Sequence, residues 1–241
     1  MPDPAVRLTP RELAGVRLAC LGRLTAGILH EFRNPLAIVQ GNLEFLAAFT
    51  ITGSAPITPG DLQQPVSDAR AGGTDLLLLC EQLRQFVHAD PAPARCNLDK
   101  TLAAAVALTR PHWKRRCREI TISRERTTVR QVAVNPGDLL FIIAALLHNA
   151  ALALPAAGGS ISIGISAERK QLACTISDNG CGISPAVLRR LGRCAVSTRA
   201  PADGRGESAL AAACLLRRAG GALAFASARG QGTSVRLLLP R

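Results

Sequence analysis

The sequence has few aromatic residues and almost no lysine. Of its 241 residues only 3% are aromatic, with no tyrosine and a single tryptophan. Proteins that bind single-stranded nucleic acid stack bases on aromatic side chains, so this composition argues against that class. Only three of the 29 basic residues are lysines, and the arginines are scattered along the chain, so the net charge of +12 reflects a compositional bias. We therefore expect no nucleic-acid partner.

Long apolar runs and ordered cysteine motifs are missing as well. No run of about eighteen apolar residues occurs, and the N-terminus lacks a basic segment followed by an apolar one, so we expect no membrane span and a cytoplasmic location. The eight cysteines include no C-x-x-C pair, which favours buried or incidental thiols over a metal site or disulfide framework. With 48% apolar residues, the chain is nevertheless able to fold around a core.

The N-terminal part is predicted to form a helical hairpin. Apolar residues recur every three or four positions over Thr9–Phe49, which is the spacing of a coiled-coil stripe, and Thr9-Pro10-Arg11-Glu12 has the composition of a capping box. The turn-rich residues 50–65 are expected to end this helix, a second helix is expected over roughly 66–89, and Asp90–Pro93 is expected to be a linker. Such a hairpin has too little core to stand alone, so we expect a homodimer with a four-helix bundle.

The rest of the chain alternates between helical and strand-like patterns. Helices are predicted over residues 97–118, 137–154 and 208–219, and strand-like runs lie within 119–134, 160–165, 172–177, 222–227 and 233–239. The last two runs flank Gly230-Gln231-Gly232 and are expected to form a hairpin. This mixture predicts an α+β fold in which helices cover one face of a sheet, an α/β sandwich.

One heptapeptide in the first helix does not suit a purely structural role. In His30-Glu31-Phe32-Arg33-Asn34-Pro35-Leu36 a proline removes a backbone donor from the helix interior, so a helix built only for dimerisation would gain from its loss. His30 and Asn34 are four residues apart and share a face outside the apolar stripe. An imidazole beside the carboxylate of Glu31 is a pairing that activates a nitrogen nucleophile. We interpret this segment as a chemical site within a dimerisation helix.

Residues in the second half have the chemistry of a nucleotide site. Asn149, in a helical segment, offers an amide oxygen of the kind that binds Mg²⁺. Asp178 follows a strand and can accept a hydrogen bond from an exocyclic amine. Gly180 and Gly182 come directly after it and permit close backbone approach.

Two further segments add groups suited to phosphate. Ser197-Thr198-Arg199 offers hydroxyls and a guanidinium, and Gly204-Arg205-Gly206 precedes a helix whose N-terminal amides can hold phosphate. In this order and spacing the segments resemble the ATP-binding domain of bacterial sensor histidine kinases, which has the Bergerat fold shared with gyrase and mismatch-repair ATPases. The resemblance runs from about Asn97 to Pro240 and includes the Gly232-Thr233 turn. The heptapeptide at His30 resembles the phospho-acceptor box of the same family.

The resemblance implies both a domain organisation and an activity. Residues 1–92 would form the dimerisation and phospho-acceptor domain, and residues 93–241 the ATP-binding domain. His30 would take the γ-phosphate of ATP, with Mg²⁺ as cofactor, and pass the phosphoryl group to an aspartate in the receiver domain of a response regulator. Neither domain is sensory, so a separate sensor protein is a further expected partner.

The resemblance also implies roles for the other matching residues. Glu31 would accept the second N–H of the imidazole, and Asn34 would position a water for dephosphorylation of the regulator. Asn149 would hold Mg²⁺, and Asp178 would bind the adenine amine. The remaining implied nucleotide-binding residues are Gly180, Gly182, Thr198, Arg199, Gly204, Gly206 and Thr233.

The family pattern is incomplete in three places. Ala145 stands where the family has the first amide of its asparagine-rich helix box, the lid segment 194–199 has no aromatic residue, and the second glycine box contains Glu207 and Ser208. A carboxylate about 4 Å from a phosphate would cost ~1 kcal/mol in water and ~4 kcal/mol at an effective dielectric of 20. Two alternatives therefore stay open: a histidine phosphotransferase or regulator phosphatase with weak or absent ATP binding, and a scaffold or chaperone ATPase without phosphohistidine.

Overall fold

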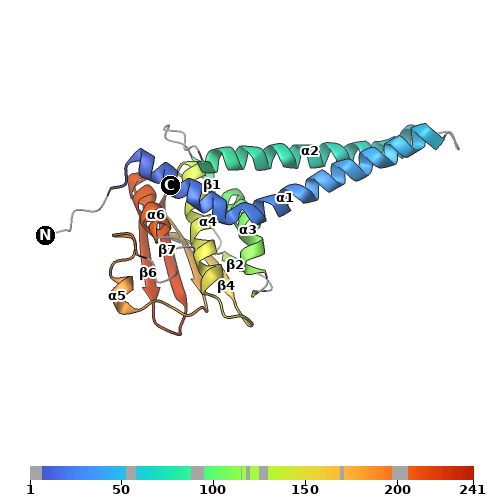
Figure 1. Ribbon diagram of the computed structural model, residues 1–241. Helices are drawn as coiled ribbons and strands as arrows, with labels where there is room; N and C mark the ends of the chain where they lie inside the picture. Colours follow the sequence, from blue (N-terminus) through green and yellow to red (C-terminus); the bar gives the residue numbers. More distant parts are fainter. Residues whose placement is uncertain are drawn as a thin grey trace.

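The structure is a computed structural model that describes residues 7–52, 58–87, 95–114, 116–117, 120–124, 130–168, 171–196 and 206–241. Helices α1 (Pro10–Thr52) and α2 (Pro59–Val87) form a long hairpin, and the other elements form an α/β domain at its foot. The hairpin projects from this domain as an arm, whereas the N-terminal part of α1 crosses the top of the domain (Figure 1). The molecule thus combines a free arm with a docked helix segment.

Both helices of the hairpin begin at a capping box. The Thr9 N–H donates to Glu12 at 2.7 Å and the Glu12 N–H donates to the Thr9 hydroxyl at 3.3 Å, which confirms the predicted helix start. Thr58 and Asp61 make the equivalent contact at 3.0 Å and start α2. Helix α1 ends at Thr52, within the range 50–65 that was expected to end it. The expected start of the second helix near residue 66 is wrong, because this second box begins α2 at Pro59, well before Pro65. The predicted linker Asp90–Pro93 lies outside the described residues.

The α/β domain is built on a mixed five-stranded sheet with the strand order β2-β4-β5-β7-β6. Its strands are β2 (Ile120–Arg124), β4 (Ile161–Glu168), β5 (Gln171–Asp178), β6 (Ala222–Ser227) and β7 (Thr233–Pro240). Strands β2 and β4 run parallel, and the other neighbours run antiparallel. A small second sheet pairs β1 (Cys96–Asn97) with β3 (Gln131–Val132). The register of the large sheet places Asp178 opposite Thr233, so two predicted nucleotide-binding residues are cross-strand neighbours.

Helices cover the sheet and complete the predicted α+β sandwich (Figure 1). They are α3 (Leu98–Trp113), α4 (Pro136–Ala153) and α6 (Glu207–Arg218), with a short α5 (Pro185–Leu188) after β5. Burial alternates along β4, where Ile161, Ile163 and Ile165 are buried and Ser162 is exposed. This period of two shows that one face of the sheet packs against the helices.

Helix α4 is the central helix of the core. Every residue from Leu139 to Leu147 is buried. Among the described helices it alone is long and apolar enough to cross a membrane, with a mean hydropathy of 1.5, and 72% of it is buried inside the fold. A core helix meets the same criterion, so this finding is weak evidence for a membrane span.

The first part of α1 belongs to the core of the α/β domain. Its buried apolar residues are Leu13, Val16, Cys20 and Leu24. They pack with the core, where α1 contacts α3 and α6. Dimerisation is predicted from the sequence as the means of burying the whole stripe, and for these four residues that prediction is wrong because a single chain buries them. Farther along the same stripe, Leu36 and Leu43 are exposed.

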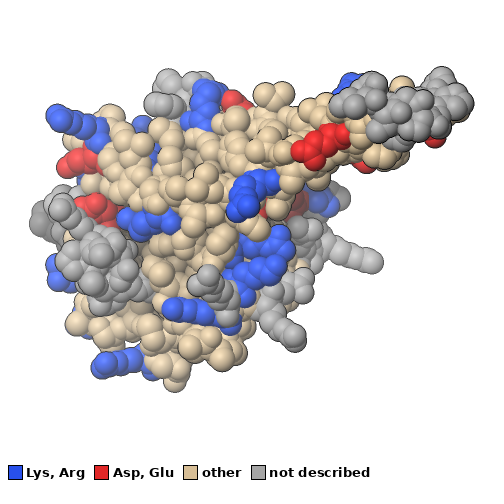
Figure 2. Space-filling view, turned by 45° about the vertical axis from the view of Figure 1, so that its right-hand side comes forward, with Lys and Arg blue, Asp and Glu red and all other residues tan. Residues whose placement is uncertain are grey.

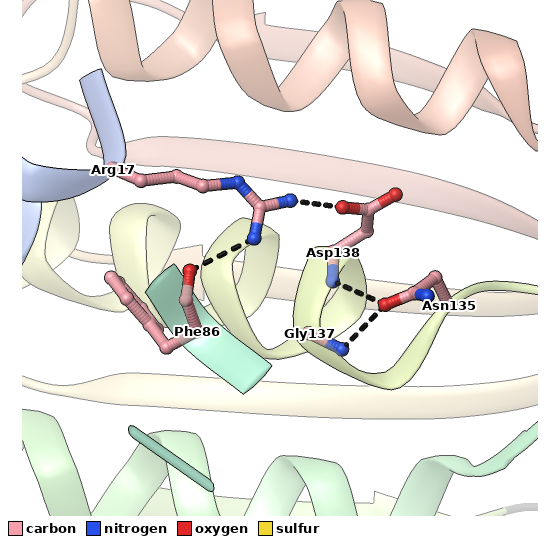
Figure 3. A network of polar contacts seen from close by, with 5 residues as sticks. All are labelled: Arg17, Phe86, Asn135, Gly137 and Asp138. Carbon is pink, nitrogen blue, oxygen red and sulfur yellow. Dashed lines mark hydrogen bonds and ion pairs between the residues drawn. The ribbon is translucent and has the colours of Figure 1, made fainter. Parts of the chain in front are cut away.

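A buried polar network joins the hairpin to the α/β domain (Figure 3). The Arg17 side chain forms an ion pair with Asp138 in the first turn of α4 and donates to the carbonyl of Phe86 near the end of α2 at 2.8 Å. The Asn135 side chain caps α4 by accepting hydrogen bonds from the N–H groups of Gly137 and Asp138. Burial raises the pKa of Asp138, and the nearby Arg17 opposes this shift. One arginine of α1 therefore connects three helices.

Candidate functional site

A cavity of about 520 Å³ lies between α4, α6 and the adjoining ends of β5 and β7. Small-molecule sites typically have volumes of about 300–1,000 Å³, so the cavity is large enough for a nucleotide. The predicted residues that line it are Asn149, Asp178, Gly182, Gly206 and Thr233. The structure thus brings together residues from four separate segments. Gly180 is buried just behind this lining, and Thr198, Arg199 and Gly204 lie outside the described residues.

One wall of the cavity is a face of α4. Leu146, Asn149, Ala150 and Ala153 line it, and their spacing of three and four residues places them on one side of the helix. Asn149 is the polar member of this face and lies one residue after the buried His148. Ala145, where the family has an amide, is only 2% exposed and packs into the core.

The loop after β5 is held in place by its own hydrogen bonds. The Asp178 Oδ1 accepts from the Gly180 N–H at 2.8 Å. The Asn179 side chain accepts from the Ser160 N–H at 2.8 Å and donates to the Gly158 carbonyl at 2.9 Å. These bonds fix the position of the Asp178 carboxylate at the wall of the cavity.

The glycines around Asp178 are required by the protein's own backbone. A Cβ on Gly180 would lie 2.5 Å from a carbonyl oxygen of α4. Gly182 and Gly232 have φ angles of +66° and +76°, and a Cβ on them would lie 2.0 Å and 1.9 Å from the carbonyls of Ala228 and Asp178. The close backbone approach expected for the nucleotide is thus made by neighbouring loops, and these glycines close the cavity wall.

The start of α6 forms the opposite wall. Gly206 is the N-cap residue and has a left-handed conformation with φ of +73°. Ser208 lines the cavity, and its Oγ accepts a hydrogen bond from Arg23 Nη2 at 3.0 Å. Glu207 is not among the described residues that line the cavity. Of the two obstacles predicted in the second glycine box, only Ser208 reaches the cavity.

The predicted acceptor residues lie on α1 where the arm begins. His30 and Asn34 are exposed and Glu31 is half-buried. Within the described ranges, Oε1 of Glu31 is buried and accepts no hydrogen bond. Consecutive residues of a helix do not face one another, so the backbone alone does not aim Glu31 at the imidazole. Pro35 is buried in the helix and cannot donate to the Glu31 carbonyl, which weakens the helix at this turn.

The helix that bears His30 also forms part of the cavity wall. Arg23 of α1 lines the cavity, and it lies seven residues before His30. Seven residues are nearly two helical turns, so both side chains leave almost the same face of α1, about 10 Å apart along its axis. Between them, a Cβ on Gly27 would lie 2.1 Å from the Leu108 carbonyl of α3, so the two helix backbones touch there.

Two basic residues of the cavity were missed by reasoning from the sequence. Arg229, in the turn between β6 and β7, lines the cavity, and its backbone packs on Gly182. Nothing in the local sequence marks it. Arg23 could have been noticed from its heptad spacing to His30, but its role depends on how α1 docks on the α/β domain.

A pair of histidines lies behind Asn149 at the contact of α3 with α4. The rings of His112 and His148 meet edge to face with centroids 4.8 Å apart. Burial lowers the pKa of His112. Its Nε2 is buried and has no hydrogen-bond partner in the described part of the chain. The neutral form of His112 is therefore the one that suits this interior.

Comparison with known proteins identifies the family. Residues 20–92 match the His Kinase A (phospho-acceptor) domain, and residues 134–241 match the histidine kinase-, DNA gyrase B- and HSP90-like ATPase domain. The two domains occur in the order predicted from the sequence. The chain belongs to the two-component sensor histidine kinases.

Individual relatives agree with this assignment. The sensor protein DegM of Bacillus sp. (strain B21-2) is 27% identical over 229 residues, which are 91% of this chain and 54% of that protein. The mycobacterial sensor histidine kinase MprB shares the fold with a TM-score of 0.54 and 19% identity, covering 62% of this chain and 97% of that one. Full-length ShkA in complex with AMPPNP has a TM-score of 0.51 and 19% identity, covering 97% of this chain and 47% of that one. The chain spans about half the length of the curated relatives it matches.

Proposed function

We propose that this chain is the catalytic core of an ATP-dependent protein-histidine kinase. ATP binds in the cavity, His30 takes its γ-phosphoryl group, and the phosphoryl group then passes to an aspartate in the receiver domain of a response regulator. The observation that supports this most is that α1, the helix of His30, contributes Arg23 to the lining of the cavity that Asn149 and Asp178 also line. Acceptor and nucleotide site therefore share one structural element.

The proposed chemistry is an in-line transfer of the γ-phosphoryl group from an oxygen of ATP to a nitrogen of the imidazole. An imidazole nitrogen of His30 forms the new bond to the γ-phosphorus, the bond to the bridging oxygen breaks, and ADP leaves. Such transfer depends mainly on alignment and on neutralising the phosphate charge. Glu31, the residue after the acceptor, has a carboxylate oxygen without a hydrogen-bond partner among the described residues. This carboxylate would accept the second imidazole N–H and select the reactive tautomer. Asn34, exposed on the same face as His30, would position the water that dephosphorylates the regulator.

The cavity has suitable groups for both ends of ATP. Asp178, oriented by Gly180, would accept from the adenine amine, and the phosphates would lie toward Gly206 at the start of α6. Mg²⁺ would neutralise phosphate charge. Among the described residues no group of three His, Cys, Asp or Glu side chains could hold a metal, so the ion would be shared by the Asn149 amide, phosphate oxygens and water. The related ShkA was solved with AMPPNP.

The exposed apolar residues of the arm support dimerisation. On α1, Leu29, Leu36 and Leu43 follow a seven-residue spacing and are 59%, 52% and 55% exposed. On α2, Leu77 and Leu78 are 74% and 55% exposed. A second copy of the hairpin would cover this heptad stripe in a four-helix bundle. The proposed homodimer therefore uses the part of the stripe that the chain itself leaves uncovered.

Charge and thiols support the remaining expectations. Lys and Arg side chains are spread over the α/β domain and the foot of the arm in Figure 2, rather than forming one stripe, which favours a protein partner over a nucleic acid. The thiols at positions 20, 80, 96, 174, 181 and 194 are free, which favours a reducing compartment. We therefore place the catalytic core in the cytoplasm, where ATP, a response regulator and a separate sensor protein would meet it.

The test is incubation of the purified protein with γ-labelled ATP and Mg²⁺. We expect an acid-labile label that His30→Gln abolishes and that the same substitution at His88 leaves in place. A label that persists in His30→Gln, or a wild-type protein that binds no ATP at millimolar concentration, would contradict the proposal. In the second case, labelling of His30 by a phosphorylated regulator would favour the phosphotransferase alternative.

A further inference from the structure

An arginine from the phospho-acceptor hairpin reaches the end of the cavity where the phosphates are expected. Arg23 is half-buried, lines the cavity and donates to Ser208 Oγ at 3.0 Å. Ser208 lies in the first turn of α6, two residues after the N-cap Gly206. This hydrogen bond joins the helix of His30 to the helix start that faces the cavity.

The partners of Arg23 leave its charge uncompensated. Ser208 is neutral, and the thiol of Cys20, which also interacts with Arg23, is held neutral because burial raises its pKa to about 11. Within the described ranges no carboxylate forms an ion pair with Arg23. A guanidinium has five N–H donors, of which the Ser208 contact uses one. An unpaired guanidinium lining a cavity suits an anionic ligand with several oxygen acceptors.

The surroundings favour phosphate at this end of the cavity. The first N–H groups of α6 have no acceptors within the helix, and the positive end of the helix dipole lies there. Asp178, the carboxylate that lines the cavity, comes from β5 and suits the amine of the base instead. Asp178 at the β5 end therefore suits the adenine amine, whereas the start of α6 together with Arg23 suits the triphosphate.

We infer that Arg23 binds the phosphate chain of the nucleotide and so ties α1 to the occupied cavity, as a nucleotide-binding residue supplied by the phospho-acceptor domain. This inference rests on the proposed function. It also gives Ser208 a role, because its hydroxyl holds Arg23 at the cavity wall instead of obstructing the phosphates.

Phosphate binding by Arg23 would also affect the position of His30 on the same helix. Arg23 and His30 leave nearly the same face of α1, about 10 Å apart along the axis. When phosphate holds Arg23, it also fixes the rotation of α1 about its axis. Arg23 would thus position the acceptor as well as bind the nucleotide.

The experiment compares ATP and adenosine binding by the full chain, using calorimetry for ATP and ligand-observed NMR for adenosine. Loss of a charge-assisted hydrogen bond weakens binding by about 10- to 100-fold, so we expect Arg23→Ala to raise the Kd of ATP by this factor and to leave that of adenosine unchanged. Arg23→Lys should lie between Arg23→Ala and wild type. Arg11→Ala, which removes an exposed arginine of the same helix, is the matched control and should bind both ligands like wild type.

Several outcomes would overturn the inference. Unchanged ATP binding by Arg23→Ala would do so while leaving the kinase proposal intact. Equal loss of ATP and adenosine would show that Arg23 only maintains the shape of the cavity. A wild-type protein that fails to bind ATP would contradict the proposed function, on which the inference rests.

Discussion

Replacing Arg17 should weaken the attachment of the hairpin to the α/β domain. Arg17→Ala removes the ion pair with Asp138, the hydrogen bond to the Phe86 carbonyl, and a guanidinium that lies 5.4 Å from the ring centre of Phe141. Breaking a buried ion pair from one side costs about 3–5 kcal/mol, because the remaining charge stays buried without a partner. In Arg17→Ala the Asp138 carboxylate is left without its partner, in surroundings where burial already raises its pKa. We expect a loss of this size in the free energy of unfolding.

The single tryptophan makes the measurement direct. Trp113 lies in α3, is 5% exposed and can report urea denaturation by fluorescence. For a chain of this size each kcal/mol corresponds to about 2–4 °C in Tm, so Tm should fall by roughly 6–20 °C. Arg17→Lys keeps the charge but lacks the forked guanidinium that contacts both Asp138 and the Phe86 carbonyl. It should lower the free energy of unfolding by less than Arg17→Ala does. Arg11→Ala, an exposed arginine of the same helix, should change stability by less than about 0.5 kcal/mol.

A double-mutant cycle separates the ion pair from the rest of the network. Because Arg17 and Asp138 touch, the loss in Arg17→Ala/Asp138→Asn should fall short of the sum of the single losses by about 0.5–3 kcal/mol. The claim that this contact holds the hairpin in place would be refuted by either of two results. One is a loss below about 1 kcal/mol in the free energy of unfolding of Arg17→Ala, and the other is strict additivity of the losses in the two single variants.

Two further predictions concern the cavity loop and pH. Gly232→Ala should weaken ATP binding by about tenfold or more in calorimetry, because its Cβ would lie 1.9 Å from the Asp178 carbonyl. Gly230→Ala is the matched control, since its φ of +77° imposes similar backbone strain but nothing lies within 4 Å of the added Cβ; equal ATP affinity in the two variants would contradict the steric explanation. Because burial lowers the pKa of His112 below its unfolded value near 6.5, the unfolded chain binds more protons, and stability should fall as pH drops through about 6.5. Urea denaturation between pH 5.5 and 7.5 should show this slope, and an unchanged slope in His112→Asn would count against the assignment.

The long elements of the α/β domain could be predicted because each has a strong local signal, whereas the short β1 and α5 were not predicted. The alternation Ser160–Ile165 and the turn at Gly230–Gly232 determine strands whose pairing the sheet confirms. The start of α2 was missed although Thr58-Pro59-Gly60-Asp61 has the same form as Thr9-Pro10-Arg11-Glu12. Gly60 and Pro65 are turn signals in the sequence, and the capping contact between Thr58 and Asp61 outweighs them.

The site was predictable in its chemistry and not in its assembly. Asn149 and Asp178 could be identified because their types and spacing match a known motif. The spacing of Arg23 to His30 is visible in the sequence, but its role at the cavity could not be predicted. That role depends on the docking of α1 through the buried Arg17 network, which joins residues far apart in the sequence. For the same reason Ser208 was counted as an obstacle, although it is the acceptor for Arg23.

The contact between Gly27 and α3 makes the arm a lever with unequal ends. If α1 turns as a rigid rod about this contact, His30 lies only about 4.5 Å beyond the pivot, whereas Thr52 lies about 37 Å beyond it. A sideways displacement of the far end is then reduced about eightfold at the histidine, so ~8 Å of movement at the tip becomes ~1 Å at the nucleophile. Misplacement by 1 Å can change a reaction rate by about a hundredfold. A coarse movement far from the cavity would thus be converted into a fine adjustment of the reacting atom.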